Sequence, residues 1–388
     1  MIGHSSNWNY PTSVRFGPGR IAELPDACKE LGMQKPLLVT DPGIAELPIL
    51  TAALEANQLQ GVETKVFSEV RANPVGQNVA MGVDVYRTGN HDGVIAMGGG
   101  SALDAAKAIA LMVGQDRPLW DFEDVGDNWK RVDPAGMAAV VAIPTTSGTG
   151  SEVGRASVIV HEQSATKKII FHPGMLPQKV ICDPELTIGL PPHITAAVGM
   201  DALSHSLEAY CAPGNHPQAD GIAAEAMRLI SVYLVKAVEE PSNIEARSAM
   251  MAASLMGATA FQKGLGAMHS MAHVIGAKLD AHHGLINAIV MPYVLCANRP
   301  EIADKMARLG RYLDLPEASF MSVLDWVLAL RQALDIPHTL VHLGVTEAHI
   351  PSFAPASVLD PSTGSNPTPM STDDFARLFQ CAIDGTLT

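Results

Sequence analysis

The stretch "GVIAMGGGSALDAAKAIALM", residues 93–112, decides how the N-terminal half of the chain folds. Its apolar start is typical of a buried strand, and its alanine-rich second part is typical of a helix. A run of three glycines (98–100) lies between them, where backbone N–H groups can approach an anion and the helix dipole attracts it. We therefore predict a strand–turn–helix unit in which Ser101 caps the helix, with Asp104 three residues further on.

This glycine turn suits a pyrophosphate, although its spacing is neither G-x-G-x-x-G nor that of a Walker A loop. A second loop, 143–154, also follows a predicted strand and is rich in glycine and hydroxyl residues. Two such loops favour a dinucleotide or another polyphosphate; the alternatives are a tight turn that needs positive φ and one ordinary long loop. Asp41 ends an earlier strand, where it could bind the ribose hydroxyls of NAD and repel a 2′-phosphate, or simply cap a turn.

Strand-like and helix-like segments alternate on either side of this unit through the first half of the chain. Alternation of this kind predicts a parallel sheet with helices on both faces. The predicted strands are 35–40, 62–70, 92–97 and 139–144; the predicted helices are 44–59, 76–90 and 101–113; and 156–173 is typical of a β-hairpin.

Strands vanish beyond residue 185, and long helices rich in alanine, leucine and methionine follow. We therefore expect two domains, an α/β domain over 1–185 and an all-helical domain over 186–388. The predicted helices of the second domain are 193–212, 218–239, 243–262, 266–279, 284–298, 301–313, 319–334 and a final capped helix from about Thr372.

Composition narrows the class of protein. A net charge of −14 argues against nucleic acid and anionic membranes as partners. Five scattered cysteines with no C-x-x-C pair fit a reducing compartment and argue against a disulfide framework. Residues 1–16 lack the apolar run of a secretion signal, and no run approaches membrane-span length. We expect a soluble cytoplasmic protein.

The helical half carries an unusual set of polar residues. Asp201 and His205 lie four residues apart in an apolar segment, so they share one face of a helix. A second segment, 264–292, adds more histidines, and an acid with several histidines suits a borderline divalent ion such as Fe²⁺ or Zn²⁺. Any one of these histidines could instead be an ordinary hydrogen-bonded core residue. Spacing does not choose between His269 and His273, or between His282 and His283.

With these motifs, the chain resembles the iron-containing (group III) alcohol dehydrogenases nearly from end to end. The resemblance implies an α/β NAD-binding domain, an all-helical metal- and substrate-binding domain, and an active site in the cleft between them, as in the dehydroquinate-synthase-like architecture. Gly154 departs from the family pattern, in which many members have Thr. The clearest matching segments are "GGGSALDAAKAIA" (98–110), "IPTTSGTGSEV" (143–153) and "MHSMAHVIGAKLDAHHGLINAIVMP" (268–292).

The resemblance also implies roles for individual residues. His273 would be a catalytic histidine that faces the substrate or nicotinamide, or else a residue that only orients a ligand, and Asp104 would support the cofactor loop. Phe261 would wall the substrate pocket. The metal ligands would be Asp201, His205, His269 and His283. The NAD site would comprise Asp41, Asn73, Gly98, Gly99, Gly100, Ser101, Thr145, Thr146, Thr149 and Lys167, with Lys168 as the alternative lysine.

The implied reaction interconverts a small primary alcohol or diol and its aldehyde by hydride transfer with NAD(H), while Fe²⁺, or alternatively Zn²⁺, polarises the substrate oxygen. The alternatives are a glycerol-type polyol dehydrogenase and a hydroxyacid–oxoacid transhydrogenase. A metal-dependent hydrolase is more remote, because it would leave the two phosphate-type loops unexplained. The apolar helical domain carries little charge, so we expect a homo-oligomer, a dimer or larger.

Overall fold

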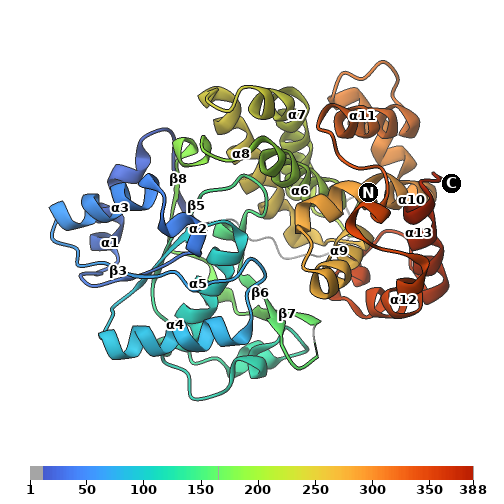
Figure 1. Cartoon of the computed structure of the whole chain (residues 1–388). Coiled ribbons are helices and arrows are strands. Elements are labelled where there is room, and N and C mark those ends of the chain that lie inside the picture. Colours follow the sequence, from blue (N-terminus) through green and yellow to red (C-terminus); the bar gives the residue numbers. More distant parts are fainter. Residues whose placement is uncertain (1–11, 165, 388) are drawn as a thin grey trace. The chain divides into compact units, whose positions relative to one another are not determined.

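The computed structural model describes residues 12–164 and 166–387 (Figure 1). They divide into two compact units, which we call the N-terminal and C-terminal units, with the boundary between Gly189 and Leu190. The expectation of no secretion signal concerns residues 1–16, of which 1–11 lie outside the described residues. Within the described ranges, no helix combines the length and the apolar character needed to cross a bilayer.

A parallel sheet forms the centre of the N-terminal unit, as the alternating pattern predicts. Six strands of the described chain follow the order β1-β8-β5-β4-β2-β3, and every neighbouring pair is parallel. The strands β1 and β8, which pair with each other at one side of the sheet, were not predicted. The bounds are β1 Ser13–Phe16, β2 Leu37–Val39, β3 Lys65–Phe67, β4 Val94–Gly98, β5 Val140–Pro144 and β8 Lys179–Cys182.

Helices cover both faces of this sheet. Ile95 and Met97 of β4 belong to a core cluster with Leu24 and Leu50 of the helices α1 and α3, whereas α5 packs against β4 and β5. The predicted helix 44–59 is two helices, because extended backbone precedes the proline that begins the second. The bounds are α1 Leu24–Glu30, α2 Pro42–Ala45, α3 Pro48–Leu59, α4 Gly76–Gly89 and α5 Gly100–Met112.

The strand order reverses its direction at one point of the sheet, between β2 and β4. The chain leaves β2 towards β3 on one side, and it leaves β4 towards β5 on the other side. Ligands of open parallel sheets bind beyond the carboxyl ends of the strands at such a switch point. Asp41 follows β2 and Gly98 ends β4, so two predicted cofactor residues lie at this point.

The predicted β-hairpin is confirmed. The strands β6, Ala156–His161, and β7, Thr166–Phe171, pair antiparallel as a separate two-stranded sheet. Val160 lies opposite Lys167 and Ile159 lies opposite Lys168, so the two candidate lysines project to opposite faces.

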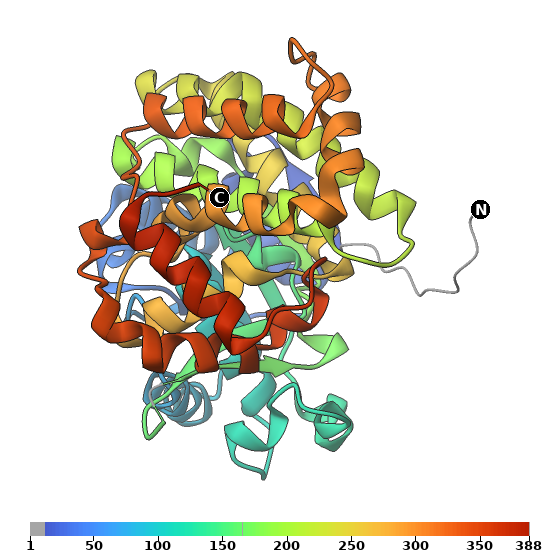
Figure 2. The ribbon, with the colours of Figure 1, turned by 90° about the vertical axis from the view of Figure 1, so that its right-hand side faces the viewer.

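The described part of the C-terminal unit contains helices and no strands. Pro292 and Pro300 lie inside α10, which is one continuous helix where we predicted two. The unpredicted α12 packs against α13, the red helix near the C-terminus in Figure 2. The bounds are α6 Pro192–Cys211, α7 Pro217–Glu239, α8 Ile244–Ala260, α9 Ala267–Leu279, α10 His283–Tyr312, α11 Phe320–Ala333, α12 Ile350–Leu359 and α13 Thr372–Asp384.

Helix α6 lies at the centre of this unit. It packs against α7, α8 and α10, and every residue from Thr195 to Cys211 is buried. A helix buried on all sides is expected to be apolar on all sides. The buried Asp201, His205 and Glu208 break this rule, so each of them needs a polar partner.

Candidate metal and cofactor sites

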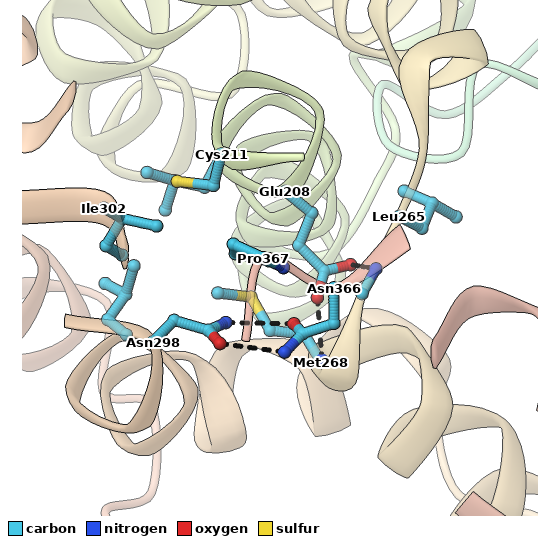
Figure 3. Close-up of a pocket in the computed structure, with 11 residues that line it drawn as sticks. Glu208, Cys211, Leu265, Met268, Asn298, Ile302, Asn366 and Pro367 are labelled. Carbon is cyan, nitrogen blue, oxygen red and sulfur yellow. Dashed lines mark hydrogen bonds between the residues drawn. The ribbon is translucent and has the colours of Figure 1, made fainter. Parts of the chain in front are cut away.

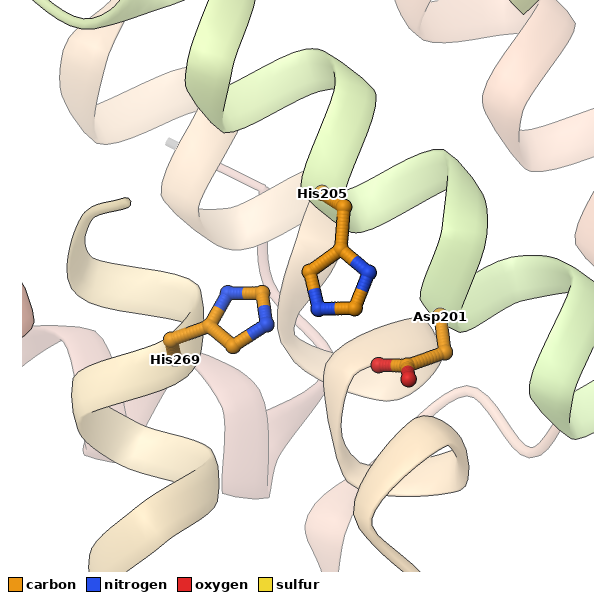
Figure 4. A group of neighbouring side chains, drawn as sticks. All are labelled: Asp201, His205 and His269. Atoms are coloured by element: carbon orange, nitrogen blue, oxygen red, sulfur yellow. The ribbon is translucent and has the colours of Figure 1, made fainter. Parts of the chain in front are cut away.

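Three buried side chains converge in the C-terminal unit. Asp201 and His205 project from successive turns of α6, and His269 projects towards them from α9 (Figure 4). Their ligand atoms all lie within 4.8 Å of one another. The ring centroids of His205 and His269 are 4.8 Å apart. One carboxylate and two imidazoles at this spacing could serve as three ligands of a divalent cation.

His283, the first residue of α10, extends this cluster. Its Nε2 lies 3.8 Å from Asp201 Oδ1, and its ring centroid is 5.3 Å from that of His269. The neighbouring His282 is instead the N-cap of α10, and its Nδ1 accepts a hydrogen bond from the Leu285 N–H. The structure therefore turns His283, and not His282, towards Asp201.

A buried amide lies among these donor atoms. Asn287 Nδ2 donates to Asp201 Oδ1 at 2.8 Å and lies 3.3 Å from His269 Nε2 and 3.2 Å from His283 Nε2. The amide Oδ1 of Asn287 is buried and accepts no hydrogen bond from the described residues. Nitrogen and oxygen donors beside an unsatisfied buried oxygen fit a borderline cation such as Fe²⁺ or Zn²⁺.

His273 faces a different partner from His269, although both lie on α9. Its Nδ1 lies 2.9 Å from Asp360 Oδ2, and its ring stacks on that of His283 at 5.4 Å. Burial by itself would raise the pKa of Asp360, but the charge and hydrogen bond of His273, with hydrogen bonds from Ser362, lower it overall. His273 is therefore held by an ionised carboxylate beside the cluster.

Two further residues border this region. The ring centroid of Phe261 lies 5.1 Å from that of His205, so this aromatic residue walls one side of the cluster. Lys263 follows closely in sequence but points away, because its Nζ contacts Asp220 Oδ1 at 2.5 Å and donates to the Tyr210 carbonyl at the end of α6. Lys263 therefore stabilises the end of the helix that bears Asp201.

The glycine turn of the N-terminal unit is tightly packed. Gly98 has a φ of +148°, and a Cβ there would lie 2.7 Å from the Cβ of Ala102. A Cβ on Gly100 would lie 2.5 Å from the Thr149 side chain, whereas one on Gly99 would make ordinary contact with Thr146 at 3.5 Å. Gly98 and Gly100 must therefore be glycine for the turn to keep this shape.

The prediction that Ser101 caps the following helix is wrong. Helix α5 begins one residue earlier, at Gly100, and none of the described side chains caps its N-terminus at Gly99. Ser101 Oγ instead donates to the carbonyl of Ala72, which precedes Asn73. Because Ser101 already lies within the helix, its hydroxyl holds the neighbouring segment and leaves the first N–H groups for another partner.

Unsatisfied hydroxyl groups surround this helix start. The side-chain oxygens of Thr40, Thr145 and Ser147 are buried, and each lacks a hydrogen-bond partner among the described residues. Thr40 follows β2 and Thr145 follows β5, and the Thr145 N–H donates to the Gly98 carbonyl at 3.0 Å. An uncapped helix N-terminus with polar groups around it fits the pyrophosphate of a dinucleotide.

Asp41 uses one carboxylate oxygen as a helix cap. Oδ1 accepts hydrogen bonds from the Gly43 and Ile44 N–H groups at 2.9 Å and 3.0 Å. Oδ2 points towards the glycine turn, where it would lie 3.3 Å from a Cβ on Gly98. The capping interpretation and the ribose-binding interpretation therefore concern different oxygens of the same side chain.

Asp104 and Lys107 of α5 hold the second loop, 143–154, against this helix. For Asp104 this is the supporting role that the resemblance implies. Asp104 accepts hydrogen bonds from Ser151 Oγ at 2.5 Å and from the Val158 N–H at 2.9 Å. Lys107, which is fully buried, donates to the carbonyls of Ser151 and Ala156. On the hairpin, the Lys168 ammonium lies 2.6 Å from Glu123 Oε2. The Lys168 ammonium is therefore paired with a carboxylate of the same unit.

Comparison with known proteins identifies the family. A model of the iron-containing alcohol dehydrogenases matches residues 11–184, and a model of the C-terminal part of the same family matches residues 195–383. The chain belongs to the iron-containing alcohol dehydrogenase family. The resemblance inferred from the sequence motifs is confirmed, and so is the fold class of a parallel-sheet unit followed by a helical unit.

Relatives of this iron-containing alcohol dehydrogenase act on several alcohols. It is 37% identical to 4-hydroxybutyrate dehydrogenase of Cupriavidus necator, covering 96% of this chain and 98% of that one. It is 33% identical to NAD-dependent methanol dehydrogenase of Bacillus methanolicus, covering 97% and 100%. The crystal structure of a 1,3-propanediol oxidoreductase matches with a TM-score of 0.92 and 33% identity, covering 98% and 100%. The chain is therefore an oxidoreductase of the alcohol dehydrogenase type.

Three polar residues of this iron-containing alcohol dehydrogenase were not predicted to lie at the site. Glu208 follows His205 by three residues, and Asn287 follows His283 by four, so helical spacing could have revealed both. Asp360 lies 87 residues beyond His273, and no local pattern connects them.

Proposed function

We propose that this enzyme is a metal-dependent NAD(H) oxidoreductase that interconverts a small primary alcohol or diol and its aldehyde. The observation that carries the proposal is the buried group of Asp201, His205 and His269, with His283 beside it. The relatives named for 4-hydroxybutyrate, methanol and 1,3-propanediol support a primary alcohol as the substrate class.

The proposed metal ligands are Asp201, His205, His269 and His283, which would hold Fe²⁺, with Zn²⁺ as the alternative. When bound, such a cation supplies Lewis acidity to the substrate oxygen, and the nicotinamide accepts or donates the hydride. The Asp201 carboxylate lowers the net charge of the loaded site, and Phe261 excludes water from one side of it.

His273 is the proposed proton-transfer residue. Its Nδ1 is engaged by Asp360 at 2.9 Å, so Nε2 is the atom that would accept or return the alcohol proton. Asp360 keeps the ring in one orientation, as a buried carboxylate does for a general-base histidine.

The proposed NAD site lies at the switch point of the sheet. Gly98, Gly99, Gly100 and the start of α5 would bind the pyrophosphate, because their N–H groups lack a side-chain cap among the described residues. Asp41 Oδ2 would bind the adenosine ribose and repel a 2′-phosphate, which favours NAD over NADP. The other proposed lining residues are Asn73, Ser101, Thr145, Thr146, Thr149 and Lys167.

We further propose a cytoplasmic homo-oligomer, a dimer or larger. Cys28, Cys182, Cys211 and Cys296 are free thiols, which suits a reducing compartment. Light scattering coupled to size-exclusion chromatography measures the assembly directly, and a mass of one 41.0 kDa chain would contradict the oligomer.

The test is anaerobic metal replacement. The purified protein is stripped of metal and given Fe²⁺, Zn²⁺ or Ni²⁺, and NADH absorbance is followed with a panel of short alcohols and aldehydes. Activity restored by Fe²⁺ or Zn²⁺ with NADH supports the proposal, and undiminished activity in metal-free protein contradicts it. Exchange between an alcohol and a carbonyl without turnover of added NADH would indicate a transhydrogenase.

A further inference from the structure

Glu208 accepts hydrogen bonds from three groups around the start of α9. Its side chain comes from α6, two turns beyond Asp201, and is 4% exposed. Oε2 accepts from the Gly266 N–H at 2.9 Å and lies 2.6 Å from His269 Nδ1. Oε1 accepts from the Met268 N–H at 2.7 Å. Each oxygen of this buried carboxylate therefore has at least one donor.

We propose that Glu208 is a positioning residue that fixes His269 in the tautomer and orientation needed to bind the metal. The proposal rests on the metal site proposed above. Both oxygens of Glu208 already accept backbone N–H groups, so the carboxylate acts as an acceptor here and His269 Nδ1 is the donor of the hydrogen bond between them. The lone pair of the neutral ring is then on Nε2, and a histidine binds metal through its unprotonated nitrogen.

The position of Nε2 agrees with this assignment. His269 Nε2 lies 3.3 Å from Asn287 Nδ2, the amide nitrogen that also contacts Asp201 Oδ1. Nε2 therefore points towards the other proposed ligands, while Nδ1 points away from them towards Glu208. The two nitrogens of the His269 ring therefore have different roles: Nδ1 contacts Glu208, and Nε2 is left to bind the metal.

Glu208 also connects two of the three helices that supply the proposed ligands. Gly266 is the N-cap residue of α9 and has no side chain to satisfy the first N–H groups of that helix. The Glu208 carboxylate takes two of these N–H groups, and its charge is favourable at a helix N-terminus. It therefore docks α9, which carries His269, onto α6, which carries Asp201 and His205.

A second side chain holds the same helix start without touching the imidazole. Asn366 Oδ1 accepts from the Ala267 N–H at 3.1 Å, and the Asn366 and Asn298 amides hydrogen-bond each other. Glu208 and Asn366 border one small buried cavity, which Figure 3 shows. Asn366 is therefore a matched control, because its removal loosens the start of α9 but leaves the contact between Glu208 and His269.

The experiment compares Glu208→Gln with Asn366→Ala. Glutamine has nearly the same size but turns an –NH₂ group towards one of the three donors, which either opposes the N–H groups of α9 or favours the other tautomer of His269. Zn²⁺ and Co²⁺ affinities are measured by chelator competition, and circular dichroism checks the metal-free fold. We expect E208Q to weaken metal binding by about 10–100-fold and N366A to change it by no more than about twofold.

Equal losses of affinity in E208Q and N366A would overturn the proposal, because Glu208 would then only dock α9. Unchanged affinity in E208Q would overturn it while leaving the metal site intact. A wild-type protein that binds neither cation would overturn the metal site and the proposal together. In a His269→Ala background, E208Q should weaken metal binding by less than about a further twofold, because its effect on the metal passes through the His269 ring.

A measurement on the unmodified protein covers the case in which E208Q does not fold. The zinc-loaded protein is labelled with ¹⁵N-histidine, and His269 is assigned by comparison with a His269→Gln variant. We expect a protonated Nδ1 and a metal-bound Nε2 in the nitrogen spectrum. A protonated Nε2, or coordination through Nδ1, would overturn the proposal.

Discussion

The two candidate roles of Asp41, capping α2 and binding the ribose, involve different oxygens of its carboxylate. Oδ1 caps α2 through the Gly43 and Ile44 N–H groups, and Oδ2 points towards Gly98. A serine retains a capping oxygen but has no charge, whereas an alanine loses both. Comparing Asp41→Ser with Asp41→Ala therefore separates the contribution to helix stability from the choice of cofactor.

We expect Asp41→Ser to raise the NADPH-to-NADH ratio of kcat/KM by at least about tenfold, because it removes a negative charge facing the 2′-phosphate. Its stability in urea should stay close to that of the wild type, whereas Asp41→Ala should lose about 1 kcal/mol. An unchanged cofactor ratio in both variants would remove Asp41 from the ribose site.

His273 can be tested in the same way, because its two candidate roles affect different quantities. We expect His273→Gln to lower kcat by about 10²–10⁴-fold, since glutamine does not transfer the proton. Metal affinity, measured by chelator competition, should be unchanged, because His273 contacts Asp360 and is not one of the proposed ligands. A parallel loss of metal affinity would instead show that His273 orients a ligand.

At the scale of elements, the short turn Ser151–Val153 buries a carboxylate beside α5. Glu152 is 2% exposed, and burial raises its pKa to about 7, although the charge of Lys107 acts in the opposite direction. In the unfolded chain the same group releases its proton near pH 4.5. Between these two values the folded state holds more protons, so a rising pH destabilises it through this group.

We expect Glu152→Gln to remove this pH dependence. The stability of the variant relative to the wild type should increase steadily from pH 4.5 to about pH 7 and level off above it, by an amount on the order of 3 kcal/mol. Urea unfolding of both proteins at several pH values measures the difference. A constant difference across this range would show that Glu152 is ionised in the folded state throughout.

Some elements of this fold carry a sequence pattern that predicts them, and others do not. The strands β4 and β5 and the helix α6 were predicted because they carry long apolar patterns. The strand β1 was missed because none of its four residues is fully buried, and β8 directly precedes the segment where the pattern changes to helices. The helix α12 has ten residues and a proline inside it. Helix α10 was divided in two near Pro300, which lacks an N–H, yet the helix continues through this residue and packs against α6, α9, α11 and α13.

The candidate metal site could be predicted from the sequence only where its residues are neighbours on one helix. Asp201 and His205 share a helix face, so local spacing revealed them. The choice of His283 over His282 depends on where α10 begins, because that boundary turns one ring towards Asp201 and makes the other a cap. Such boundaries depend on backbone hydrogen bonds that no spacing rule specifies.

At the scale of the whole molecule, the two candidate sites belong to different compact units. The donor cluster lies in the C-terminal unit, and the uncapped glycine turn lies in the N-terminal unit. A ligand that binds only the folded state stabilises the unit that holds it, by about 4.1 kcal/mol at 1,000 times its Kd. Each ligand should therefore protect its own set of backbone amides from hydrogen exchange.

We expect Zn²⁺ to slow amide exchange in α6 and α9, and NADH to slow it around α5. Asp201→Ala should abolish the zinc effect and lower activity more than about 100-fold, because it removes the only carboxylate of the proposed ligand set while leaving the helix buried. The NADH effect around α5 should survive in this variant, and it serves as the control for folding. Zinc protection that persists would exclude Asp201 as a ligand. Loss of the NADH effect together with the zinc effect would show instead that the two units bind their ligands as one cooperative structure.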